Sequence, residues 1–104
     1  MAILLIFLTC ANKTEAKQIV SDLVAARLVA CGLMMAPTDS HYVWEGKAEW
    51  TEEVPLLLKT IPDKEAAVRA RVAALHSYAT PAILSWTAEA GPDFAAWVRE
   101  GVEP

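Results

Sequence analysis

The chain has 104 residues, which suits one domain spanning 1–104 in which roughly 60–70% of the unfolded chain's surface can be buried. Its formal net charge is −4 and its Lys and Arg residues are scattered, which excludes the concentrated basic face that nucleic acid requires. Hydrophobic residues make up 55% of the chain and the mean hydropathy is +0.30. We therefore expect self-association, because one copy of so small a domain cannot hide this much apolar surface.

Residues 1–9 are almost wholly apolar and predict a buried first strand. The run is too short to span a bilayer. It also lacks the positively charged beginning and the longer apolar stretch of a secretory signal. We therefore expect a cytoplasmic protein with no membrane partner, in which Cys10 and Cys31 remain free thiols.

A first helix is predicted to follow Asn12, which is a favourable N-cap residue with Glu15 three positions later. The apolar residues beyond it recur at helical spacing and form one continuous stripe, made of Ala16, Ile19, Val20, Leu23, Val24 and Leu28. This stripe predicts a helix that packs one face against the sheet.

A long hairpin is predicted next. Residues 31–35 are apolar, Pro37 interrupts the strand, and residues 40–44 resume it with alternating side chains. Gly46 supplies the turn, and residues 48–60 return, with Pro55 expected to mark an edge or a bulge. So long a hairpin should protrude beyond a small subunit.

The remaining elements are a second helix opening at Pro62 and Asp63, a fourth strand over residues 81–87, and a short C-terminal helix after Gly91. The second helix is expected to face inward through Ala67, Val68, Arg71, Val72 and Leu75. The order predicts an α+β, ferredoxin-like βαββαβ sandwich with both main helices on one face of the sheet.

Catalytic patterns are absent at the level of local spacing. Glu52 and Glu53 are adjacent strand residues, so their side chains should point to opposite faces and cannot act together. We therefore expect a protein that is not an enzyme. Copper-type donors are present but are not spaced as a ready-made site, and they are Cys10, Cys31, Met34, Met35, His41 and His76.

Several segments, read in order, resemble the CutA divalent-ion tolerance proteins. They include Thr9, the helix ending at Leu28, Ala30-Cys31, the run from Ser40 to Lys47, Lys59-Thr60, and His76-Ser77-Tyr78. The resemblance runs almost end to end. It implies a homotrimer of ferredoxin-like subunits, related in plan to the nitrogen-regulatory PII proteins, that responds to metal ions or binds copper.

The resemblance also implies a copper site, which uses a Cys at the end of the first strand and two consecutive His residues. This chain has Leu8, Leu75 and His76 there, so only His76 carries over. Leu33 and Ala82 likewise replace an Asn and a Glu of the family pattern. We therefore expect weak binding of copper or another divalent metal through His76 with Cys10 or Cys31.

A cleft between subunits, lined by Tyr42, Trp44, Lys59 and Tyr78, is the second site that the resemblance implies. Lys59 at a strand end either reaches toward water or meets an anion. The alternatives to metal tolerance are accordingly a PII-like sensor of a small anionic metabolite in this cleft, and a trimeric scaffold for other proteins.

Overall fold

The computed structural model describes residues 1–103. Its strands are β1 (Ala2–Cys10), β2 (Cys31–Met34), β3 (Thr38–Trp44), β4 (Lys47–Thr60) and β5 (Ile83–Glu89). Its helices are α1 (Lys13–Ala25), α2 (Glu65–Leu75) and α3 (Pro92–Val102), with a 3-10 turn, η1, at Pro62–Lys64. The predicted α+β order is confirmed, with the second strand divided into β2 and β3.

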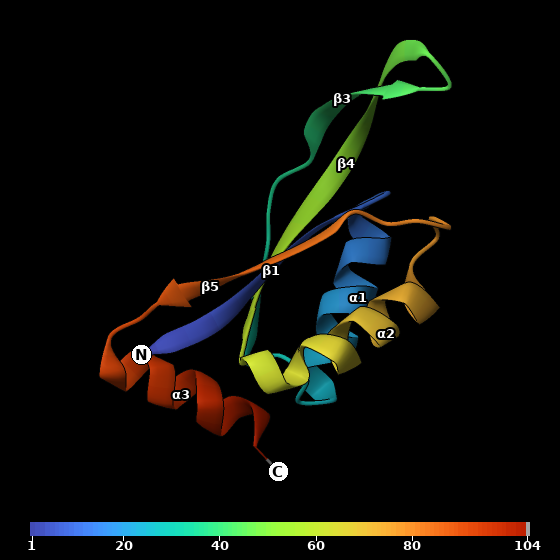
Figure 1. Ribbon diagram of the computed structural model, residues 1–104. Coiled ribbons are helices and arrows are strands. Elements are labelled where there is room, and N and C mark those ends of the chain that lie inside the picture. The colour runs from blue at the N-terminus through green and yellow to red at the C-terminus, as the bar shows by residue number, and fades with distance from the viewer. Residues whose placement is uncertain (104) are drawn as a thin grey trace.

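One antiparallel sheet has the order β2-β4-β1-β5, and β3 extends it by pairing with the first half of β4. Helices α1 and α2 lie together on one face of the sheet, while α3 lies near the N-terminal end of β1 (Figure 1). The main core fills the space between the sheet and these two helices, through residues such as Ile6, Leu8, Leu56, Val68 and Val72. A smaller core lies under α3, around Ile3 and Val98.

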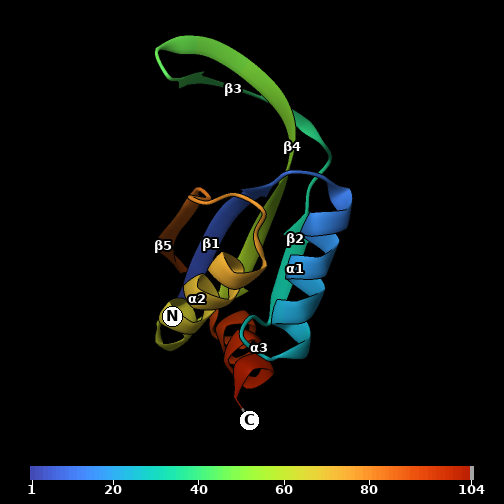
Figure 2. The ribbon, with the colours of Figure 1, turned by 90° about the vertical axis from the view of Figure 1, so that its right-hand side faces the viewer.

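The β3–β4 hairpin projects from this body as a curved arm (Figure 2), and the molecule measures 45 × 24 × 23 Å. We refer to Thr38–Trp44 and residues 47–53 as the arm. At its tip Glu45 and Gly46 have φ values of 50 and 77°, which is the left-handed pair required by a two-residue turn between twisted strands. The protruding hairpin predicted from the sequence is therefore present.

Some predicted details differ in the structure. Helix α1 ends at Ala25, because Ala26 caps it and Arg27 then adopts a φ of 56°. Of the α2 residues predicted to face inward, Ala67, Arg71 and Leu75 are exposed, and only Val68 and Val72 are buried. Val24 of the α1 stripe is exposed as well. Strand β5 begins at Ile83, two residues later than expected.

Pro55 does not lie in an edge strand, but it does lie at an irregularity of the bulge kind, because residues 35–37 stand opposite only residues 54 and 55 of β4. It belongs to the central strand β4, where it pairs with Thr9 of β1 and its carbonyl accepts a hydrogen bond from the Met35 amide. The ladder on that side is interrupted between β2 and β3, so a residue without an N–H group is tolerated there. None of the described helices is long and apolar enough to cross a membrane.

Candidate functional site

Three potential metal ligands meet where β1, α1 and the end of α2 come together. Cys10 is the last residue of β1, Glu15 lies in the first turn of α1, and His76 directly follows α2. One donor atom from each residue lies within 4.8 Å of the others. We call Cys10, Glu15 and His76 the donor cluster.

His76 is held by hydrogen bonds at both ring nitrogens. Its Nε2 lies 2.8 Å from the carbonyl oxygen of Thr9, and its Nδ1 lies 3.0 Å from the amide nitrogen of Tyr78. A carbonyl oxygen only accepts and an amide N–H only donates, so these partners require a neutral ring with its proton on Nε2. The imidazole therefore ties the end of β1 to the segment after α2.

Glu15 links the same segments through its carboxylate. Its Oε1 accepts from the Ala11 amide at 3.0 Å and its Oε2 accepts from the Ser77 amide at 3.0 Å. Burial by itself raises the pKa of Glu15, but the hydrogen bonds from Ala11 and Ser77 outweigh it, so the net pKa is lowered. Asn12 caps α1 by accepting from the Glu15 amide at 2.9 Å, as the sequence predicted.

Cys10 is fully buried, and its thiol faces an acidic neighbourhood. Burial, followed by the charges of Glu15 and Glu53, raises the pKa of Cys10 to about 12. The thiolate is the form that binds metal, so the folded protein keeps this sulfur in its weaker-binding protonated form.

The donor cluster fits a metal in the kind and proximity of its atoms, since thiolate, imidazole and carboxylate suit copper and zinc. Without a metal, however, the thiol is protonated and both nitrogens of the imidazole are already hydrogen-bonded. A metal would have to displace the thiol proton and one hydrogen bond of His76. These residues can therefore hold a metal only in competition with contacts that stabilise the fold.

Two residues proposed from the sequence lie elsewhere. Cys31 opens the edge strand β2 and pairs with Lys59, so it does not join the donor cluster. Lys59 lies near α3, where its Nζ is 5.5 Å from the centre of the Phe94 ring. The sequence pattern placed both residues correctly on strands. It could not show that they lie beside the C-terminal end of β4, far from the donor cluster and from the arm.

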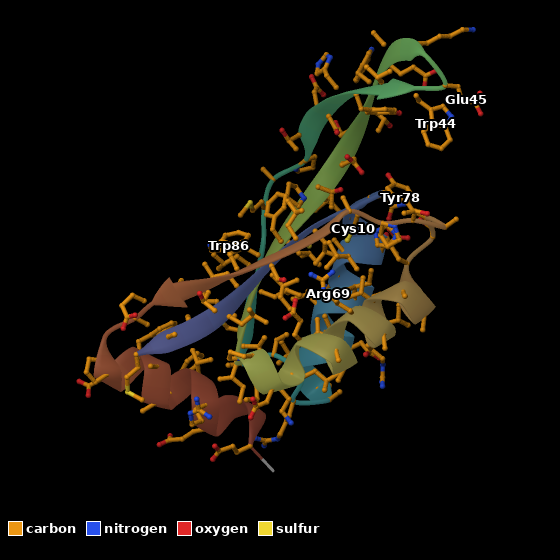
Figure 3. All side chains as sticks on the ribbon, viewed as in Figure 1. Cys10, Trp44, Glu45, Arg69, Tyr78 and Trp86 are labelled. Atoms are coloured by element: carbon orange, nitrogen blue, oxygen red, sulfur yellow. The ribbon has the colours of Figure 1, made fainter. Side chains whose placement is uncertain are left out.

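The other three predicted cleft residues do come together. Tyr42, Trp44 and Tyr78 line a groove of ≈ 1000 Å³ between the arm and the segment that follows α2. Figure 3 shows the Trp44 side chain extending from the arm on the side where Tyr78 lies. The other lining residues are Thr9, Ser40, Glu49, Thr51, Glu53, Ala79, Thr80 and Ala82. We call this space the arm groove.

Glu53 is the polar centre of the arm groove, although only 8% of it is exposed. Its Oε2 accepts hydrogen bonds from the Thr9 hydroxyl at 3.1 Å and from the Tyr78 hydroxyl at 3.0 Å. Burial and then this bond to Glu53 raise the pKa of Tyr78 to about 12, so the phenol remains a donor at neutral pH.

Sequence reasoning named Glu15 only as a capping partner and Glu53 only as one of an adjacent pair. A signal for Glu15 existed, since a residue in the first turn after a short β1–α1 connection must lie near the end of β1. For Glu53 the expected opposite orientation holds, because Glu52 is exposed while Glu53 is buried. Its contacts with Thr9 and Tyr78 depend on distant segments.

Comparisons with known proteins agree with this architecture. The family model of the CutA1 divalent ion tolerance protein matches residues 4–101. The divalent-cation tolerance protein CutA of Archaeoglobus fulgidus is 38% identical over 99 residues, covering 94% of this chain and 96% of that protein. The Xenopus laevis CutA homolog is 37% identical over 95 residues, which are 90% of this chain but only 63% of that longer protein.

Solved structures show the same fold. CutA1 from Ehrlichia chaffeensis superimposes with a TM-score of 0.94 at 29% identity, covering 98% of this chain and 96% of that one. The Archaeoglobus fulgidus CutA structure, described as periplasmic, superimposes with a TM-score of 0.92 at 38% identity, covering 99% and 100%. The chain therefore belongs to the CutA1 divalent ion tolerance protein family.

Proposed function

We propose that this protein acts in divalent-cation tolerance by binding copper, or another divalent metal, weakly at the donor cluster. The observation that carries the proposal is the convergence of a thiol, a carboxylate and an imidazole from separate elements to within 4.8 Å. Of the two thiols predicted from the sequence, Cys10 belongs to this cluster, and Glu15 joins it and His76 as a ligand that was not predicted. Binding is weak because the metal must compete with the Cys10 proton and with the backbone partners of His76.

We also propose that the protein is not an enzyme. A general base needs a free lone pair within reach of substrate, whereas both nitrogens of His76 are engaged with backbone groups. Glu52 and Glu53 point to opposite sides of β4, so they are not positioned as a catalytic pair.

Self-association belongs to the same proposal, and we expect a homotrimer. Its support is the apolar sheet face opposite α1 and α2, where Leu33, Leu84 and Trp86 are exposed. A cytoplasmic location is proposed on the free thiols Cys10 and Cys31. The rival function, binding of an anionic metabolite, has less support, because Glu49 and Glu53 line the arm groove and Lys59 lies outside it.

Equilibrium dialysis with copper under anaerobic conditions tests the metal proposal. Cys10→Ala and His76→Ala should each weaken binding about tenfold or more, because each removes a ligand atom. Cys31→Ala is the matched control, since it removes the other thiol and should bind like the parent. Equal binding by all the folded variants, with folding checked by circular dichroism, would refute the donor cluster as the metal site.

A further inference from the structure

The arm groove has a composition unlike that of the donor cluster. Its aromatic side chains are Tyr42, Trp44 and Tyr78, its charged side chains are Glu49 and Glu53, and no Lys or Arg of residues 1–103 lines it. Lys47 lies opposite Trp44 near the arm tip, but it is not among the lining residues. The groove is therefore acidic and aromatic together.

Glu53 lines this groove and has one carboxylate oxygen without a protein partner. Both of its hydrogen bonds, from Thr9 and Tyr78, end on Oε2. Within the described chain Oε1 has no hydrogen-bond partner and still retains contact with solvent. A carboxylate that is 8% exposed, yet keeps one oxygen unpaired, is prepared to accept a hydrogen bond from a ligand donor.

Glu49 supplies a second carboxylate along the same strand face. The two glutamates are four residues apart on β4, so their Cα atoms are separated by about 13 Å at the usual rise of a strand. Tyr42 pairs with Glu49 across the arm, and Trp44, with 60% of its surface exposed, lies beyond it. Aromatic faces attract cations and also pack against methylene chains.

We propose that the arm groove binds a linear aliphatic polyamine. One ammonium group donates a hydrogen bond to Oε1 of Glu53, the methylene chain lies against Trp44 and Tyr42, and a second ammonium group meets Glu49. The groove volume of ≈ 1000 Å³ accommodates such a chain. A quaternary ammonium would fit less well, because it has no N–H group for the Glu53 oxygen.

Spermidine is the probe, and isothermal titration calorimetry in the presence of a metal chelator measures its binding to the full chain. Glu53→Gln should weaken binding about tenfold, because it removes the charge from a buried hydrogen-bond acceptor while keeping its shape. Glu52→Gln is the matched control, since it removes the same charge from the adjacent residue on the opposite, exposed face of β4. It should bind spermidine like the parent.

The outcomes are distinct. Equal weakening by Glu52→Gln and Glu53→Gln would mean diffuse attraction to an acidic protein, and would overturn the proposal. So would choline or magnesium binding as tightly as spermidine. Cys10→Ala should leave spermidine binding unchanged, which separates this site from the metal proposal.

Nuclear magnetic resonance supplies a readout that does not depend on a variant's stability. The chain has four tryptophans, and each indole N–H gives its own signal. Spermidine should shift the signal of Trp44, which lines the groove, and leave that of Trp86, which lies on β5 beside Leu5 and away from the arm, in place (Figure 3). A shift at Trp86 with none at Trp44 would refute the groove as the binding site.

Discussion

At the scale of single residues, the polar groups around the end of β1 satisfy one another. The carboxylate of Glu15 binds two backbone amides, and the ring of His76 binds the Thr9 carbonyl and the Tyr78 amide. Glu53 accepts hydrogen bonds from Thr9 and Tyr78. Hydrogen bonds to buried charged groups of this kind stabilise a fold. Glu15 and His76, two of the proposed metal ligands, therefore also join β1, α1 and the segment after α2.

Glu15→Gln should accordingly destabilise the metal-free protein. The substitution weakens the charge-assisted bonds from the Ala11 and Ser77 amides, and we expect a loss of about 1–2 kcal/mol at neutral pH. Urea denaturation measures it. Glu52→Gln, at an exposed carboxylate, should change the free energy of unfolding by no more than about 0.5 kcal/mol. Equal stability of the two variants would contradict this role of Glu15.

The same variant predicts a pH dependence. The pKa of Glu15 is lowered in the folded protein, so its contribution to stability is complete above the ordinary pKa and is lost as the pH falls through the lowered one. The difference in unfolding free energy between the parent and Glu15→Gln should therefore shrink between about pH 7 and about pH 3. A difference that grows on acidification would reverse the sign and refute the lowered pKa.

At the scale of elements, the arm depends on a tight turn and on a strand that continues past its neighbours. Strand β4 runs from Lys47 to Thr60 and pairs in turn with β3, β1 and β2. Within residues 1–103 no layer packs over the outer side of the arm, so Val43, Trp44 and Trp50 remain exposed. The expectation that Trp44 is buried by another molecule stays a prediction.

Gly46→Ala tests the turn. A Cβ at this position meets no atom within 4 Å, so the cost comes from the backbone φ of 77° alone, and we expect about 1 kcal/mol. Gly91→Ala is the control, because its added Cβ also meets nothing and its φ of −59° suits any residue. Urea denaturation that finds Gly46→Ala as stable as Gly91→Ala would show that the turn relaxes into another conformation.

At the scale of the whole molecule, one sheet face is covered by α1 and α2 and the other is largely bare beyond α3. Paired residues share a face, so the register places Leu33, Leu57, Phe7 and Leu84 in one row across the bare side. Leu84 is 59% exposed and Leu33 is 49% exposed. A contiguous apolar row of this kind is typical of an interface between protein chains.

Leu84→Glu should therefore disrupt assembly. We expect sedimentation equilibrium of the parent at micromolar concentration to give a trimer, and the variant to shift toward the monomer, because a buried carboxylate without a partner is costly. Val24→Glu is the control, since Val24 is 43% exposed on α1, outside the bare face. A monomeric parent would refute the proposed trimer. Equal dissociation of both variants would refute the assignment of the subunit interface to this face.

The sequence by itself determined the order of elements, the Asn12 cap, the turn at Gly46 and the protruding arm, because each depends on local periodicity or on the conformational range of one residue. It also separated Glu52 from Glu53, since strand neighbours alternate. Tertiary structure alone decided that Cys10 and His76 meet at Glu15 while Cys31 does not. It likewise decided that Lys59 lies against Phe94, outside the arm groove. Periodicity tells which face a side chain occupies, whereas the meeting of distant segments depends on how the sheet and helices pack.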